Sequence, residues 1–490
     1  MYFVDCEALQ LSIIKNYLYN LTYQIFLILV PLLTVPYISR TLGADAVGMN
    51  AYTNSIMSYF ILFANLGLSL YGNRTIAYTR DSVEERSTRF WEIVTLKLVM
   101  GVISFVCFTI FVLFYNQYTN LLWLQSIQLV STAFDISWFF VGVEDFKRTI
   151  TRNILVKLLS LILIFSFVRT PGDLPLYIII ICCSGLLGNL TLWTYIKRYI
   201  RKVKISSLNF SGHLRPVIIL FLPQIATSIF VSVNRLFLGG LSTMTETGYF
   251  DNSDKVIRIF LSFIAAIGTV IFPRIANYFK KNDYKKVTLF MSQAFDSVNA
   301  ISIPIICGIF SISTPFSDLF FGSNFDGIDI VLSILSIELL FMGWSSIIGQ
   351  QFLVAVDKPK GLTISMVIGV IVIVVSDLFL IPLHGAVGAA VGSVLGEFTI
   401  SAIQLIYVHR NNLVDLRTLF KDLWKFLLGG MTVFITANLT CHLIKESILQ
   451  IILSVFISTF SYAITLMILK PRVTVNLKNQ IINILEKKSR

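Results

Sequence analysis

Long apolar segments separated by short polar stretches run along almost the whole chain. A helix needs about 20 mostly apolar residues to cross the hydrocarbon core of a bilayer, so each long segment predicts a transmembrane helix. About fourteen segments are long enough, and we therefore predict an all-α integral membrane protein. The approximate ranges of these segments are 18–38, 47–71, 91–115, 119–141, 150–168, 174–196, 214–238, 246–272, 289–313, 328–354, 360–381, 384–408, 423–443 and 447–469.

The basic residues between these segments fall almost entirely in alternate loops. One set of loops carries nearly all of them, whereas the other set contains only Arg40, Arg169 and Lys445. Loops rich in Lys and Arg mark the cytoplasmic side of a membrane protein, and an even number of helices places both termini on one side. We therefore expect a multi-pass protein with both termini in the cytoplasm.

Composition narrows the function further. Hydrophobic residues make up 56% of the 490 residues and charged residues only 13%, with a net charge of +12. In a soluble protein that charge would suggest nucleic acid. Here the cations lie in loops and set the topology, so we expect no nucleic-acid partner. The four His and six Cys residues show no metal-ligand spacing, and the sequence has no P-loop, dinucleotide or nucleophile-elbow motif. We expect a transporter without a bound metal, not an enzyme.

Two short echoes indicate an internal duplication. The polar and glycine pattern of residues 40–55 returns at 235–253, and that of residues 73–78 returns at 273–278. Each echo falls on the helix pair that opens a block of six predicted helices, and transporters are often built from repeated halves. We predict two pseudo-symmetric six-helix lobes plus two extra helices. The boundaries are 1–208 for the first lobe and its basic linker, 209–409 for the second, and 410–490 for helices 13 and 14 with a cytoplasmic tail.

Charged side chains inside the predicted spans are candidate site residues, because they cost several kcal/mol unless they face protein or water. In the span 246–272, Asp251, Asp254, Lys255 and Arg258 are spaced so that all four share one helix face. Two interpretations stay open. The cations bind an anionic substrate while Asp251 or Asp254 carries a coupling ion, or the two i,i+4 pairs only neutralise each other and hold helices together.

Three further cations are candidates for substrate binding. Arg235 lies in the span 214–238, while Lys97 and Lys157 lie six or seven residues inside their spans. For the two lysines, extension of the side chain back to the interface is an equally good explanation. With Lys255 and Arg258, these residues would place positive charge over most of the membrane depth.

The span 119–141 carries a polar stripe that ends in Asp135, a third candidate for ion coupling. Gln125, Gln128 and Thr132 precede it on the same face. Hydrogen bonding between helices is the alternative explanation for such neutral polar stripes. Pro31 and Pro36 interrupt the first span and predict a kink there, which suits either alternating access or ordinary packing.

Several blocks along residues 15–470 resemble those of one family when they are taken in order. The blocks are Pro36–Gly43 with Gly48 and Tyr52, Gly72–Arg74, Trp138–Lys147, Leu222–Gln224, Pro273–Arg274 and Ile381–Ala390. They are similar to the blocks of Wzx-type polysaccharide-repeat flippases. These proteins belong to the multidrug/oligosaccharidyl-lipid/polysaccharide exporter superfamily.

This resemblance implies a function in surface polysaccharide biosynthesis. Two lobes would surround a central cavity in a bacterial inner or plasma membrane. By alternating access they would move an undecaprenyl-pyrophosphate-linked oligosaccharide from the inner to the outer leaflet, for O-antigen or capsule. The expected partners are this lipid-linked oligosaccharide, the bilayer, and a polysaccharide polymerase with export proteins. We expect no cofactor, with proton or sodium coupling left open. The alternative is a cation-coupled multidrug exporter of the same superfamily.

Overall fold

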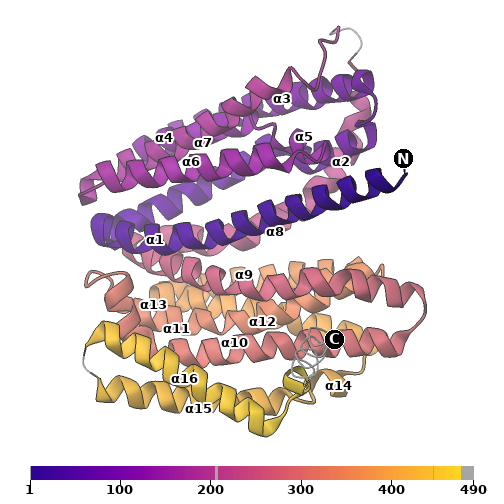
Figure 1. The fold of residues 1–490 in the computed structure, drawn as a ribbon. Coiled ribbons are helices and arrows are strands. Elements are labelled where there is room, and N and C mark those ends of the chain that lie inside the picture. Colours follow the sequence, from indigo (N-terminus) through magenta and orange to yellow (C-terminus); the bar gives the residue numbers. More distant parts are fainter. Residues whose placement is uncertain (1, 205–207, 445, 476–490) are drawn as a thin grey trace. The chain divides into compact units, whose positions relative to one another are not determined.

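The computed structural model describes residues 2–204, 208–444 and 446–475, and the regular secondary structure of these residues is helical throughout (Figure 1). Nine helical segments within the described ranges are long and apolar enough to cross a membrane. The predicted all-α membrane fold class is thereby confirmed. The chain forms two compact units, Met1–Gly239 and Gly240–Arg490. The predicted boundaries after residues 208 and 409 stay predictions, and part of the predicted cytoplasmic tail, residues 476–490, lies outside the described residues.

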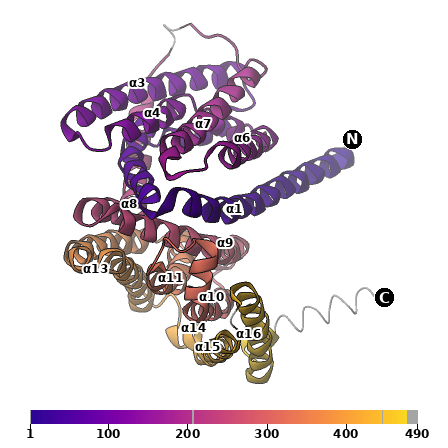
Figure 2. The same cartoon turned by 90° about the vertical axis from the view of Figure 1, so that its left-hand side faces the viewer.

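The first unit is a bundle in which α4 has a central position. This helix packs against α1, α3 and α7, and α6 packs against α1 and α7 (Figures 1 and 2). The elements are α1 (Tyr2–Asn65), α2 (Leu68–Thr79), α3 (Val83–Tyr115), α4 (Thr119–Ala133), α5 (Ser137–Gly142), α6 (Phe146–Phe167), the short helix η1 (Pro171–Asp173), α7 (Leu174–Ile196) and α8 (Ser211–Leu241).

In the second unit, α10 contacts most of the other helices. It packs against α9, α11, α12, α15 and α16, and α15 and α16 lie side by side (Figure 1). The elements are α9 (Met244–Lys280), α10 (Tyr284–Phe320), α11 (Ile328–Ser336), α12 (Glu338–Ser345), the π-helical segment η3 (Ser346–Leu353), α13 (Pro359–Arg410), α14 (Leu416–Phe420), α15 (Leu423–Leu443) and α16 (Ser447–Leu469).

All fourteen predicted spans fall on helical segments, but not on one helix each. The first span and most of the second, up to Asn65, are continuous in α1, where the backbone leaves helical geometry at Gly43 with φ of 80°. The second span ends in α2. The spans 360–381 and 384–408 are likewise joined in α13 across Gly385, with φ of 53°. Glycine adopts positive φ at little cost, so both bends fall on glycine. The span 119–141 is instead divided, because α4 ends at Ala133 and α5 begins at Ser137.

The bend in α13 is capped by a side chain from another helix. The Ala386 N–H donates to Glu246 Oε2 at 2.7 Å, and Glu246 lies in the first turn of α9. A bend leaves N–H groups without an intrahelical carbonyl, and a carboxylate satisfies one of them. A Cβ at Gly385 would lie 2.7 Å from the same Glu246 oxygen, so this position also needs glycine for space.

Aromatic packing joins α3 and α5 next to the polar site of the first unit. The Phe90 side chain is fully buried and stacks on Trp138 with ring centroids 5.8 Å apart. Phe139 meets Phe90 edge to face at 5.2 Å. Such pairs add about 0.5–1.5 kcal/mol each beyond the area that they bury. The cluster fixes α5 against α3, two turns before Lys97.

Candidate functional site

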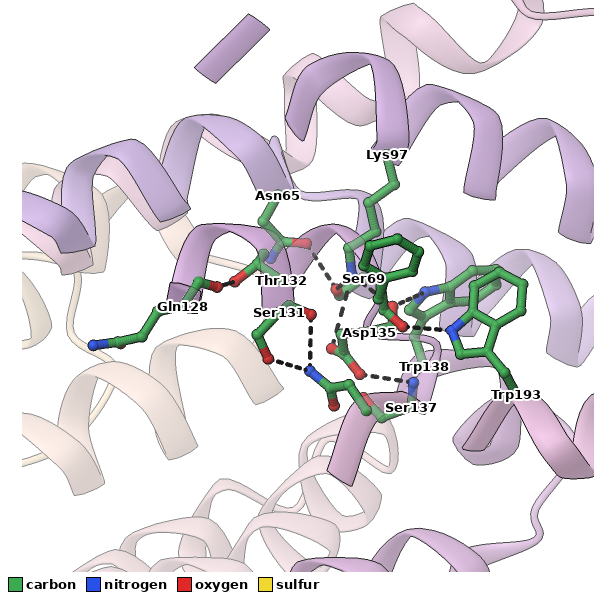
Figure 3. A network of polar contacts seen from close by, with 12 residues as sticks. Asn65, Ser69, Lys97, Gln128, Ser131, Thr132, Asp135, Ser137, Trp138 and Trp193 are labelled. Atoms are coloured by element: carbon green, nitrogen blue, oxygen red, sulfur yellow. Dashed lines mark hydrogen bonds and ion pairs between the residues drawn. The ribbon is translucent and has the colours of Figure 1, made fainter. Parts of the chain in front are cut away.

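Lys97 lies inside the first unit in a network of polar contacts (Figure 3). Its side chain on α3 is 1% exposed, and its ammonium lies 3.7 Å from Asp135 Oδ2. The ammonium also donates to the Asp135 carbonyl at 2.8 Å and to Ser69 Oγ at 3.2 Å. The Ser69 hydroxyl donates in turn to Asn65 Oδ1 at 2.7 Å. Lys97 is therefore buried among protein groups and does not extend to an interface.

The network supplies hydrogen-bond donors to the backbone carbonyls at the break between α4 and α5. Carbonyl groups at the end of α4 have no helical N–H partner, and two indoles and Lys97 supply donors in their place. Trp193 Nε1 donates to the Phe134 carbonyl at 2.8 Å, and Trp138 Nε1 donates to the Asp135 carbonyl at 3.1 Å. The Asp135 carboxylate accepts the Ser137 N–H at 2.9 Å and so starts α5. This geometry favours a structural role for both Lys97 and Asp135, whereas their roles in substrate binding and ion coupling stay predictions.

The stripe that precedes Asp135 links α4 to α1. Gln125 Nε2 donates to Thr53 Oγ1 at 2.9 Å, and Gln128 Nε2 donates to Asn54 Oδ1 at 3.2 Å. The Thr132 hydroxyl donates to the carbonyl of its own helix at residue 128. Hydrogen bonding between helices, the alternative expected for this stripe, is confirmed for the two glutamines.

The charged face predicted in the second unit lies on α9 and forms two ion pairs. Lys255 Nζ is 2.6 Å from Asp251 Oδ2, and Arg258 Nε is 2.7 Å from Asp254 Oδ2. The carboxylates are 7% and 6% exposed, whereas the Lys255 and Arg258 side chains are 37% and 40% exposed. Each cation is therefore paired with a buried carboxylate, while its own side chain stays partly exposed. The two ion pairs of the second interpretation are therefore present, and an anion could reach Lys255 or Arg258 only at the exposed part of each side chain.

Among the described residues of the second unit, five more carboxylates are buried, and three of them lie on α12 and α13. Glu338 begins α12, and Asp377 and Glu397 lie on the two halves of α13. Among the described residues, neither oxygen of Asp377 has a hydrogen-bond partner. A Cβ at Gly392 would come within 2.5 Å of Asp377 Oδ1, so the carboxyl group lies directly against the second half of the helix.

The remaining predicted cations occupy separate places in the first unit. Arg235 on α8 is partly exposed and donates to the Val231 carbonyl at 2.7 Å. Lys157 is half-buried on α6, and no ion pair of Lys157 occurs in the part of the chain that the structure describes. The structure brings Lys97 together with Asp135 and pairs the four charges of α9. Over the described ranges, no three or more His, Cys, Asp or Glu side chains are grouped to hold a metal ion.

The sequence pattern did not predict a buried chain of contacts at the start of α8. His213 Nε2 lies 2.8 Å from Glu92 Oε2, and its Nδ1 lies 2.7 Å from the Tyr71 hydroxyl. Glu92 Oε1 also accepts the Asn209 N–H at 2.8 Å, and Arg89 approaches Oε2 at 3.0 Å. Because partners more than a hundred residues apart share no short spacing, periodicity could not predict this contact chain. The only available hint was an acidic residue near the start of an apolar segment.

Known proteins place the chain in a family. A family model described as polysaccharide biosynthesis protein matches residues 13–279, which is more than half of the chain. The chain belongs to this family. A putative O-antigen transporter of Escherichia coli (strain K12) is 26% identical over 415 residues, and the match covers 83% of this chain and 99% of that relative. The resemblance to Wzx-type flippases is thereby confirmed.

Solved structures share the fold of this family member. A lipid II flippase MurJ in an inward closed conformation superposes with a TM-score of 0.74 at 16% identity, over 93% of this chain and 98% of that one. An inward-facing MATE family multidrug resistance transporter gives a TM-score of 0.60 at 14% identity, over 81% and 94%. At such low identity the likeness concerns the fold alone. It agrees with a multi-pass membrane protein.

Proposed function

We propose that this protein is a flippase for lipid-linked oligosaccharide repeat units in surface polysaccharide biosynthesis. The observation that carries the proposal is the match to the putative O-antigen transporter over 99% of its length. A match of that extent covers nearly the whole relative and 83% of this chain, and not one shared segment. The substrate would be an undecaprenyl-pyrophosphate-linked oligosaccharide, moved from the inner to the outer leaflet by alternating access.

The physical task explains the absence of catalytic motifs. Moving a pyrophosphate and several sugars through hydrocarbon without hydrogen-bond partners costs on the order of tens of kcal/mol. A flippase lowers this cost with polar and cationic side chains at membrane depth, while the polyprenyl tail stays in lipid. No covalent bond changes in this process. Lys255 and Arg258 are the best-placed cations of the second unit, because both are partly exposed.

The paired carboxylates of α9 suggest how binding and ion coupling are joined. A phosphate that approaches Lys255 competes with Asp251 for the same ammonium. Protonation of Asp251 weakens its hold on the cation and favours phosphate, and loss of that proton favours release. We therefore include proton coupling at Asp251 or Asp254 in the proposal, with sodium as the other ion to be tested.

The location and partners of the protein belong to the same proposal. The basic alternate loops support a bacterial inner or plasma membrane topology with both termini in the cytoplasm. A polymerase and export proteins that use the flipped repeat unit are the expected partners. The alternative, a cation-coupled multidrug exporter, has weaker support, since the likeness to a multidrug transporter is one of fold at 14% identity.

Deletion and complementation test the function directly. We expect a deletion strain to lose its surface polysaccharide and to accumulate lipid-linked repeat units on the inner leaflet, and the wild-type chain to restore both. A strain that keeps its polysaccharide but becomes sensitive to cationic drugs would show that the multidrug alternative is correct. Immunoblotting of membranes must accompany both measurements, because a misfolded chain would imitate loss of transport.

A further inference from the structure

A groove of about 530 Å³ lies between α6 and α7 of the first unit, apart from all the candidate residues above. The two helices pack against each other and are joined by the short connection 168–173, so they run in opposite directions. On α6, Lys147, Thr151, Leu155 and Leu159 follow one another every four residues, so they line one face. Ser184, Leu187, Gly188, Thr191 and Tyr195 line the groove from α7.

The groove changes from basic to apolar along its length. Lys147, Arg148 and Arg152 lie at one end with Asp145, which gives three cations and one carboxylate. Leu155, Leu159 and Leu187 line the other end and are 60%, 45% and 57% exposed. From Lys147 to Leu159 the helix rises about 18 Å. A ligand that fits this gradient has an anionic head and an apolar tail.

Arg148 and Asp145 are engaged with each other and shape the rim of the basic end. Arg148 Nε lies 2.6 Å from Asp145 Oδ2, and the guanidinium lies 4.5 Å from the ring centroid of Tyr195. The Tyr199 hydroxyl donates to the same Asp145 oxygen at 2.6 Å. Burial and the Asp145 carboxylate raise the pKa of Tyr199, so this hydroxyl keeps its proton at neutral pH. Asp145 is the only acidic side chain among the described residues that line the groove, and its negative charge would repel an anion. Its contacts with Arg148 and Tyr199 reduce that repulsion.

Arg152 is held in place from α7. Its Nη1 donates to Asn189 Oδ1, and Asn189 Nδ2 donates to the carbonyl and the hydroxyl of Ser131, each at 2.9 Å. The floor of the groove is Gly188, where a Cβ would lie 2.5 Å from Val156 Cγ2 and 3.2 Å from Arg152 Cδ. The small residue lets the helices approach and leaves the guanidinium at the wall of the groove.

We propose that the α6–α7 groove binds an anionic phospholipid of the surrounding bilayer. The lipid phosphate contacts Lys147 and Arg152, with the Thr151 hydroxyl beside them, and an acyl chain lies along Leu155, Leu159 and Leu187. Charge complementarity selects the head, since the cations exceed the single carboxylate at this end and basic pockets between membrane helices bind anionic headgroups. The exposed leucines select a lipid over a free phosphate. This site does not depend on the proposed function.

Native mass spectrometry of the full chain in detergent tests the proposal with phosphatidylglycerol and phosphatidylcholine of equal chain length. We expect phosphatidylglycerol to bind more tightly. Lys147→Gln should weaken it about fivefold, the effect of one basic residue near an anionic surface, and Arg152→Gln should weaken it at least as much. Leu159→Trp fills the apolar end and should weaken both lipids. Lys285→Gln, an exposed lysine at the start of α10, is the matched control for loss of one charge and should change nothing.

Each other outcome has a definite meaning. Equal affinity for the two lipids, or unchanged affinity in Lys147→Gln, would overturn the proposal. Displacement of phosphatidylglycerol by inorganic phosphate alone would identify a phosphate site. Tighter binding of a polyprenyl pyrophosphate, lost in the same variants, would mark the groove as a docking place for transported lipid and would also overturn the proposal. If Arg152→Gln is not stable in detergent, Lys147→Gln and Leu159→Trp decide the question.

Discussion

The Lys97 ammonium holds Asp135 twice, by its carboxylate at 3.7 Å and by its backbone carbonyl at 2.8 Å. The first contact neutralises a charge inside the bundle, and the second satisfies a carbonyl at the break between α4 and α5. A lysine near the end of a helix stabilises it by the same means. The ion pair and the hydrogen bond contribute differently to the free energy of unfolding, and substitutions of Lys97 and Asp135 can measure each contribution.

Substitution of one partner should destabilise the first unit strongly. Lys97→Met leaves Asp135 without its cation, and breaking one side of a buried pair costs about 3–5 kcal/mol. The double change Lys97→Met with Asp135→Asn should recover part of this loss. The Asp135 carbonyl keeps the Trp138 indole as a donor but still loses its hydrogen bond to a charged group, which is worth about 1.5–3 kcal/mol. Thermal unfolding in detergent measures both. Lys157→Met, on a half-buried lysine, is the control and should have a small effect; equal losses in the two single lysine variants would contradict the structural role.

Charge at Lys255 should matter for export if this residue binds the pyrophosphate. Lys255→Arg should keep most of the activity, while Lys255→Gln should lose about tenfold, the value of one charge-assisted hydrogen bond. The double change Asp251→Asn with Lys255→Gln removes both charges of the pair. Polysaccharide export at equal membrane abundance is the measurement, and rescue by the double change would favour a purely structural pair. Arg235→Gln tests the same role of positive charge independently on α8, and it should also reduce export if Arg235 binds the pyrophosphate.

Glu92 should anchor the start of α8 to the first unit. Its carboxylate accepts from His213, Arg89 and the Asn209 N–H, and Glu92→Gln replaces one acceptor oxygen by a donor. We expect a loss of about 1–3 kcal/mol, the cost of leaving buried polar groups without partners. Limited trypsin cleavage at the basic residues 197–204 should become faster. Glu84→Gln, on an exposed residue of the same helix, should leave the cleavage rate unchanged. Equal rates in both variants would refute the anchor.

Two neighbouring glycines on α8 give a sharp comparison. A Cβ at Gly239 would lie 2.0 Å from Tyr52 Cδ2, whereas a Cβ at Gly240 would meet nothing within 4 Å. Gly239→Ala should therefore destabilise the protein by about 1–3 kcal/mol through overpacking. Gly240→Ala should be neutral or stabilise it by about 0.5–1 kcal/mol, since alanine favours the helix. Melting temperatures of the two variants in detergent measure the difference. Equal melting temperatures would show that Tyr52 moves aside without cost.

Hydropathy predicted the helices well because the bilayer imposes one length on every span. It predicted the bends less well. Pro31 and Pro36 pointed to a kink in α1, but the residue that leaves helical geometry is Gly43. A membrane helix can absorb a proline by small local adjustments, whereas a positive φ needs glycine. The break before Ser137 was also not predicted, because hydropathy does not show where backbone groups stop bonding within the helix and bond to side chains instead.

The candidate site was predictable only within single helices. The pairs of α9 follow from i,i+4 spacing, and both form as expected. The partner of Lys97 lies 38 residues away on another helix, and the partner of His213 lies 121 residues away. Such contacts depend on how helices pack, which periodicity does not encode. Lys97 therefore looked like a cavity cation although its ammonium is used inside the bundle.

The cap on the bend of α13 makes two helices mechanically dependent on each other. Glu246 belongs to α9, yet it holds the Ala386 N–H at the point where α13 changes direction. If α13 straightens or bends further, either the hydrogen bond between Glu246 and the Ala386 N–H breaks or the first turn of α9 moves with α13. The charged face of α9 begins one turn later, at Asp251. A motion of α13 during transport would therefore displace α9 along its axis through the Glu246 hydrogen bond, and Lys255 and Arg258 would move with it.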